Sequence, residues 1–93
     1  EEMGSTYMLL VVKTNPFNIL DKTWTLLLPD GATYKFKIIT NTIKLIEAKD
    51  RNGNYISFTY TSFGKLNTVT ETLGRAINFN YDSSNRLTSI TQN

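Results

Sequence analysis

The feature that most constrains the fold is a self-similarity with a 21-residue period in the second half of the chain. Residues 50–70 align without gaps on residues 71–91. The identical pairs are Gly53/Gly74, Ile56/Ile77, Phe58/Phe79, Tyr60/Tyr81, Ser62/Ser83, Leu66/Leu87 and Thr70/Thr91. Because a fixed period of this length indicates stacked supersecondary units, we predict a repeat protein.

A third and less regular copy lies upstream. Lys44-Leu45 precedes Lys65-Leu66 by the same 21 residues, and Asp30-Gly31 leads into an aromatic segment with a one-residue shift. We therefore divide the chain into a linker or expression remnant (1–5), a strand segment with a degenerate copy (6–45), and two hairpin repeats (46–93, with units 50–70 and 71–91).

Each unit is predicted to be a β-hairpin. Ile56, Phe58 and Tyr60 alternate with more polar residues, which places them on one face of a strand. Glycine or asparagine in the turns supplies the positive φ that tight hairpin loops need, with Gly64 and Asn85 at equivalent positions. The residues that define the repeat are Gly53, Phe58, Tyr60, Gly64, Leu66, Gly74, Phe79, Tyr81, Asp82 and Leu87.

One spacing departs from simple alternation. Leu66 and Val69 are three residues apart, as are Leu87 and Ile90, so they cannot share a face of a regular strand. A β-bulge or bend after each Lys/Arg-Leu pair would restore the alternation.

The first half also reads as strands. Trp24, Leu26 and Leu28 alternate before a Pro-Asp-Gly turn signal, and Tyr34 and Phe36 are then expected to face the core. No window shows helical spacing. The predicted fold class is all-β, an open antiparallel meander of consecutive hairpins with about eight strands.

The composition excludes several functions. The chain has no histidine and no cysteine, so neither a Ser-His-Asp triad nor a thiolate metal site can form within it. A net charge of +2 without a basic block does not indicate nucleic-acid binding. The longest apolar run, residues 7–12, is too short for a membrane span, and no signal peptide is recognised. We expect no catalytic residue, metal or cofactor, and hence no enzyme.

Three patterns allow a sharper interpretation. Asp50-x-Asn52-x-Asn54 is reminiscent of a calcium loop, but Tyr55 and Thr61 stand where glycine and glutamate are needed, so a polar turn is favoured. Asp50 and Glu71 are repeat-equivalent carboxylates that could form the acid pair of a glycosidase, although ordinary solvated acids in turns are the simpler explanation. Tyr55 is expected to be exposed, opposite the face of Ile56, and is a candidate carbohydrate contact.

The segment from Gly74-Arg75 through Phe79-Asn80-Tyr81-Asp82 to Arg86-Leu87 resembles the YD repeat of Rhs proteins, toxin-complex shells, bacterial wall-associated proteins and teneurins. Two positions depart from the pattern: Thr61 follows Tyr60 where aspartate is usual, and Asn85 replaces glycine.

The resemblance implies an extracellular or cell-surface scaffold in which many hairpins form one long β-sheet. Such a shell encloses a polypeptide or mediates cell-surface interaction. The implied partners are further repeats of the parent chain and an enclosed polypeptide or carbohydrate, and self-association through sheet edges is expected because an excised array exposes them.

Overall fold

The computed structural model describes residues 8–15 and 18–93, with side chains described from Thr23 onward. These residues form eight β-strands and no helix. The strands are β1 (Met8–Asn15), β2 (Asn18–Leu27), β3 (Thr33–Ile39), β4 (Thr42–Lys49), β5 (Tyr55–Tyr60), β6 (Leu66–Glu71), β7 (Ala76–Tyr81) and β8 (Leu87–Gln92).

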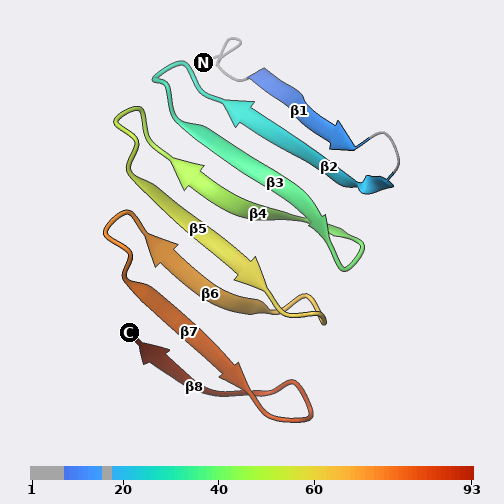
Figure 1. Ribbon diagram of the computed structural model, residues 1–93, viewed down its shortest axis with the longest axis vertical. Coiled ribbons are helices and arrows are strands. Elements are labelled where there is room, and N and C mark those ends of the chain that lie inside the picture. The colour runs from blue at the N-terminus through green and yellow to red at the C-terminus, as the bar shows by residue number, and fades with distance from the viewer. Residues whose placement is uncertain (1–7, 16–17) are drawn as a thin grey trace, which may run out of the picture.

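All eight strands belong to one sheet in the order of the chain, from β1 to β8. Every neighbouring pair is antiparallel. Figure 1 shows the strands succeeding one another down the long axis of the molecule, with turns alternating between the two sides. The predicted all-β meander of consecutive hairpins is therefore confirmed.

The sheet has one apolar face. Trp24 opposes Phe36, which opposes Leu45; Tyr34 opposes Ala48, which opposes Ile56; and Phe58 opposes Val69, which opposes Ile77. We call this surface the apolar face; it comprises Trp24, Leu26, Tyr34, Phe36, Ile38, Ile43, Leu45, Ala48, Ile56, Phe58, Tyr60, Leu66, Val69, Ile77, Phe79, Tyr81, Leu87 and Ile90. The other face carries mainly Thr, Lys, Ser and Asn, as the alternation predicts.

No second layer covers this face in the described part of the chain. From Thr23 onward no hydrophobic side chain is buried, and Ile43 and Ile90 are 57% and 56% exposed. The prediction that Tyr34 and Phe36 face a core is therefore wrong, although they do share a face. A single sheet has no opposing element to exclude water, whereas ordinary domains pack two layers.

Five of the turns in the described part of the chain share one hydrogen-bonding pattern. In each, the first residue donates its N–H to the carbonyl of the fifth, and the fourth donates its N–H to the carbonyl of the first. The first residues are Leu28, Asp50, Thr61, Glu71 and Asp82. The fourth residues all have positive φ: Gly31 (94°), Gly53 (89°), Gly64 (82°), Gly74 (85°) and Asn85 (62°). The predicted turn geometry is confirmed, and Asn85 adopts the conformation that glycine adopts elsewhere.

The predicted bulge is also confirmed. Thr59 opposes Thr68 but the next residue, Tyr60, opposes Leu66, so Asn67 is an extra residue in β6. The same shift makes Thr88 the extra residue in β8 and Ile46 the extra residue in β4. The three bulged positions, 46, 67 and 88, follow the 21-residue period.

The β3–β4 hairpin explains the one-residue shift of the sequence alignment. The sequence alignment pairs Phe36 with Phe58. In the sheet, however, Phe36 opposes Leu45 beside a bulge, and this is the position that Tyr60 has opposite Leu66. The β3–β4 hairpin continues past this point to a tight turn at Thr40-Asn41, where both residues have positive φ. Compared with the β5–β6 hairpin, this hairpin is longer between the bulge and its Thr40-Asn41 turn and shorter on the other side of the bulge. The net difference in length is one residue.

Alanine substitutions at two glycines separate backbone strain from turn packing. Gly53 and Gly64 both have positive φ, but a Cβ at Gly53 meets nothing within 4 Å, whereas one at Gly64 would lie 3.3 Å from Cβ and Oγ1 of Thr40. Each change is expected to lower the free energy of unfolding by about 1–2 kcal/mol through the backbone. Gly64→Ala should cost more than Gly53→Ala in urea denaturation; equal losses would show that Thr40 yields without cost.

Candidate functional site

Two tyrosine hydroxyls connect successive hairpins. Tyr60 Oη donates a hydrogen bond to the Leu45 carbonyl at 2.6 Å, and Tyr81 Oη donates to the Leu66 carbonyl at 2.6 Å. Each acceptor residue directly precedes a bulged residue, where the regular backbone pairing is interrupted. The repeat tyrosine therefore satisfies a carbonyl of the hairpin before its own.

Tyr60 contacts β4 in a second way. The Lys44 ammonium lies 5.7 Å from the centroid of its ring, within range of a cation–π interaction. Partial burial raises the pKa of the Tyr60 phenol, so the hydroxyl stays a donor throughout the neutral range. Because Tyr60 also opposes Leu66 on β6, this one side chain joins three strands.

The first residue of each turn stabilises the turn with its side chain. Asp82 Oδ1 accepts hydrogen bonds from the backbone N–H groups of Ser84 (2.8 Å) and Arg86 (3.0 Å), and its Oδ2 accepts from Arg86 Nε at 3.0 Å. Thr61 Oγ1 accepts the two equivalent backbone bonds, each at 3.2 Å. Thr61 therefore makes the same backbone contacts in its turn as Asp82 makes in the next turn on that side.

Asp50 and Glu71 occupy the same place in the turns of the opposite side. Asp50 Oδ1 accepts from the N–H groups of Asn52 (2.8 Å) and Asn54 (2.9 Å), and Oδ2 accepts from Asn54 Nδ2 at 3.0 Å. Glu71 accepts from the Leu73 N–H and pairs with Arg75 Nε. The polar-turn interpretation of Asp50-x-Asn52-x-Asn54 is confirmed, because nitrogen donors occupy the oxygens that a calcium site would use. Residues 23–93 contain no group of three or more His, Cys, Asp or Glu placed to hold a metal.

The electrostatics of these carboxylates do not suit acid catalysis. The Asn54 amide lowers the pKa of Asp50, the Arg75 guanidinium lowers the pKa of Glu71, and the Arg86 backbone N–H lowers the pKa of Asp82. A general acid requires a raised pKa, so the shift is in the opposite direction.

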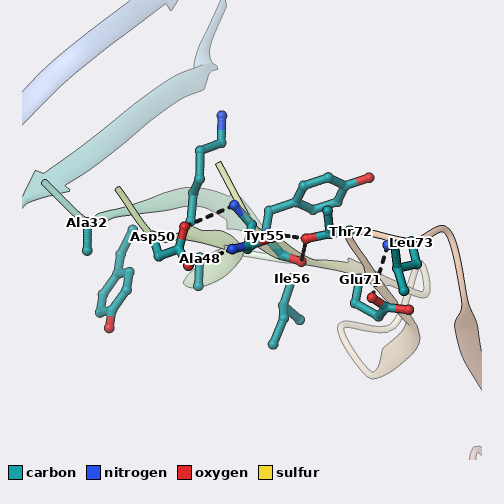
Figure 2. A pocket seen from close by; sticks show the side chains of 11 residues that line it. Ala32, Ala48, Asp50, Tyr55, Ile56, Glu71, Thr72 and Leu73 are labelled. Carbon is teal, nitrogen blue, oxygen red and sulfur yellow. Dashed lines mark hydrogen bonds between the residues drawn. The ribbon is translucent and has the colours of Figure 1, made fainter. Parts of the chain in front are cut away.

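Asp50 and Glu71 both line one shallow, open groove of about 570 Å³. Its lining residues are Ala32, Tyr34, Ala48, Lys49, Asp50, Asn54, Tyr55, Ile56, Glu71, Thr72 and Leu73. Figure 2 shows Ile56 and Tyr55 pointing to opposite sides of the sheet, as the alternation predicts. The groove thus combines part of the apolar face with the polar turns at one side of the sheet.

The predicted exposure of Tyr55 is wrong. Tyr55 is half-buried, whereas Ile56 is 44% exposed. The Tyr55 N–H donates to Thr72 Oγ1 at 2.7 Å, the Thr72 hydroxyl donates back to the Tyr55 carbonyl at 3.3 Å, and Lys49 is the cross-strand neighbour of Tyr55. In a single-layer sheet both faces are open to water, so these in-plane neighbours determine exposure.

No family model, curated protein or solved structure matches this chain. In the described part of the chain, no helix is long and apolar enough to cross a membrane.

The repeat pattern does not reveal the acceptors of the tyrosine hydroxyls. It marks Leu66 and Leu87 as repeat positions, but it does not mark the carbonyls of Leu45 and Leu66 as partners of Tyr60 and Tyr81. The signal was present in the constant spacing of 15 residues between each leucine and the tyrosine that reaches it. Thr72, which joins two turns, has no counterpart in the repeat pattern that would have identified it.

Removing one hydroxyl tests the connection between hairpins. Tyr60→Phe and Tyr81→Phe should each lower the free energy of unfolding by about 0.5–1.5 kcal/mol, since a part-buried carbonyl loses its donor. The matched control is Tyr34→Phe, because Tyr34 lies on the same face and no hydrogen bond to its hydroxyl is found among the described residues. Urea denaturation measures all three; equal losses in all three would contradict the assignment.

The turn carboxylates predict a dependence of stability on pH. Their ordinary pKa values are 3.8 for Asp50 and Asp82 and 4.5 for Glu71, and all three are lowered in the folded protein. Folding therefore favours the ionised forms, and this contribution is complete above pH 4.5 and lost as the pH falls through the lowered folded values.

The urea midpoint should accordingly fall as the pH drops below about 4.5. Asp82→Asn should flatten this dependence, since the amide cannot ionise. Thr61→Ala is the control: it removes the equivalent turn contacts without removing a charge, so it should lower the midpoint without changing the slope. An Asp82→Asn profile parallel to the unsubstituted one would contradict the assignment.

Proposed function

We propose that this chain is a structural β-hairpin repeat segment of a secreted or cell-surface protein of the YD/Rhs type, forming part of a β-shell scaffold. The observation that carries the proposal is the repetition of three features with a 21-residue period: the turn, the bulge, and the tyrosine that reaches the previous hairpin. A unit that bonds to its predecessor in the same way each time can be added without limit.

The two faces of the sheet suit the wall of a container. One face carries polar and charged side chains that water solvates, and the apolar face is uncovered over β2 to β8. A wall of this kind presents its polar side to solvent and its apolar side to an enclosed polypeptide. The proposed role is structural, and it assigns the carboxylates Asp50, Glu71 and Asp82 to turn formation.

Extending the array by one unit tests the proposal. A copy of residues 73–93 is appended after Asn93, which continues the 21-residue period and places a tyrosine where it can reach the Leu87 carbonyl. The free energy of unfolding should rise by at least about 1 kcal/mol, the value of one such hydrogen bond, and the amides of β8 should exchange more slowly.

Two controls accompany the extension. An appended copy of the same composition in scrambled order should give no gain, and a copy carrying Tyr81→Phe should give a smaller gain than the intact one. If the scrambled and intact copies stabilise equally, the chain is not an extendable repeat and the proposal fails.

The alternative is a carbohydrate-binding β-module, for which the specific observation is that Tyr55 lines the open groove beside Asp50, Asn54 and Glu71. A glycan array separates the two functions. The scaffold role predicts no binding above background; binding that Tyr55→Ala abolishes would establish the alternative instead.

A further inference from the structure

The turn between β4 and β5 contains an asparagine followed by glycine, and no other asparagine of the sequence precedes a glycine. Asparagine is among the thermolabile residues, because the backbone nitrogen of the next residue can attack its side-chain carbonyl carbon. Glycine hinders this attack least, since it has no Cβ and leaves the backbone free to rotate. Asn52-Gly53 is therefore the position where the sequence most favours this reaction.

The structure leaves the side-chain amide of Asn52 accessible. Asn52 is exposed, and among residues 23–93 no hydrogen bond to its side-chain amide is found. The next residue also has open space around it, because a Cβ at Gly53 would meet no atom within 4 Å. Nothing in the described turn therefore blocks the approach of the Gly53 nitrogen to the side chain of Asn52.

Comparison with the turn from Leu28 to Ala32 explains why this amide has no partner. In that turn the third residue, Asp30, accepts the Ala32 N–H at 2.9 Å. In the turn from Asp50 to Asn54 the first residue performs this task, because Asp50 Oδ1 accepts the Asn54 N–H at 2.9 Å. The third residue, Asn52, is therefore not needed to hold the turn with its side chain.

The attacking nitrogen is also the least firmly held of its kind. The Gly53 N–H donates to the Asp50 carbonyl at 3.1 Å, whereas the equivalent bonds of the other four turns measure 2.7 to 3.0 Å. This N–H must leave its acceptor and lose its proton before the nitrogen can attack, and a longer hydrogen bond opposes that step less. The backbone of this turn thus favours the reaction as well as the side chain does.

We propose that Asn52 is a self-modification site, at which the Gly53 nitrogen displaces the side-chain amide and water completes the conversion to aspartate or isoaspartate. A bond forms between Gly53 N and Asn52 Cγ, the Cγ–Nδ2 bond breaks, and Nδ2 leaves as ammonia with the proton of the Gly53 N–H. Water then opens the resulting succinimide at one of its two carbonyls. Neither step is a redox reaction, and the site does not depend on the scaffold role.

Isoaspartate at this position would weaken the connection between two hairpins. It routes the backbone through Cβ of residue 52 and so lengthens the turn by one methylene. Asp50 holds the turn at its present length, because its carboxylate accepts the N–H groups of Asn52 and Asn54 and its carbonyl accepts that of Gly53. β4 and β5 are joined by three residue pairs, of which Lys49 and Tyr55 are next to this turn. A longer turn is therefore expected to loosen that pair first.

The test incubates the full folded chain in buffer and follows each asparagine by peptide mapping and mass spectrometry, with fragmentation that distinguishes isoaspartate from aspartate. Asn52 should convert at least roughly tenfold faster than Asn54 or Asn85. Asn54 is the control within the same turn, since Tyr55 follows it and its Nδ2 donates to Asp50 Oδ2 at 3.0 Å. Asn52→Gln should abolish the conversion at position 52, because the longer side chain would have to close a larger ring.

A second measurement tests the consequence for the turn. As isoaspartate accumulates, the urea midpoint should fall and the Tyr55 amide should exchange faster. Asn52→Asp is the matched control, because it introduces the new charge without lengthening the backbone. It should keep the exchange rate of the Tyr55 amide close to that of the unmodified chain.

Three outcomes overturn the inference. Conversion of Asn54 or Asn85 as fast as Asn52 would show that the Asn52-Gly53 turn has no special reactivity. Conversion in urea but not in the folded chain would show that the turn protects Asn52. Accumulation of isoaspartate with an unchanged urea midpoint and unchanged exchange at Tyr55 would show that the turn accommodates the longer backbone.

Discussion

The bulge that follows each repeat leucine is the constraint on which the rest of the sheet depends. One extra residue, Ile46, Asn67 or Thr88, resets the alternation so that the residues on either side of it share the apolar face. At the first two bulges the interruption leaves the carbonyls of Leu45 and Leu66 without a regular partner, and Tyr60 and Tyr81 of the next hairpin donate to them at 2.6 Å. Local irregularity thus creates the contact that orders neighbouring units.

Connections of this kind matter more here than in a two-layer domain, because no hydrophobic side chain is buried in the described sheet from Thr23 onward. Neighbouring turns also contact one another at both sides of the sheet. Thr40 Oγ1 donates to the Ser62 carbonyl at 3.3 Å on one side, and Thr72 bonds to both backbone groups of Tyr55 on the other. Each hairpin is therefore held mainly by the one before it and the one after it, which is the energetic arrangement of a linear repeat array.

Much of this fold was accessible from sequence because its units are local. The period, the hairpins, the glycine turns and the bulge all follow from spacings shorter than a single repeat, as the three-residue gap from Leu66 to Val69 shows. Contacts with neighbouring strands could not be predicted from the sequence. The tyrosine acceptors and the partial burial of Tyr55 are set by residues 15 and 17 positions away, and the absence of a covering layer cannot be read from alternation.

The β3–β4 hairpin shows that a periodic sequence gives a periodic sheet only where the turns have the same length. Phe36 occupies the place of Tyr60 beside the bulge but has no hydroxyl, and its hairpin ends in a two-residue turn where the other units have five-residue loops.

The apolar face and the backbone pairs of the sheet contribute to the fold in different ways. Burial of the apolar face depends on area and is insensitive to direction, so many partners could cover it. Backbone pairs are directional, so the pairing of Val69 with Phe58 on one side and with Ile77 on the other allows one register only. The register of the sheet therefore depends on its backbone pairs, and the apolar face contributes stability once the register has been set.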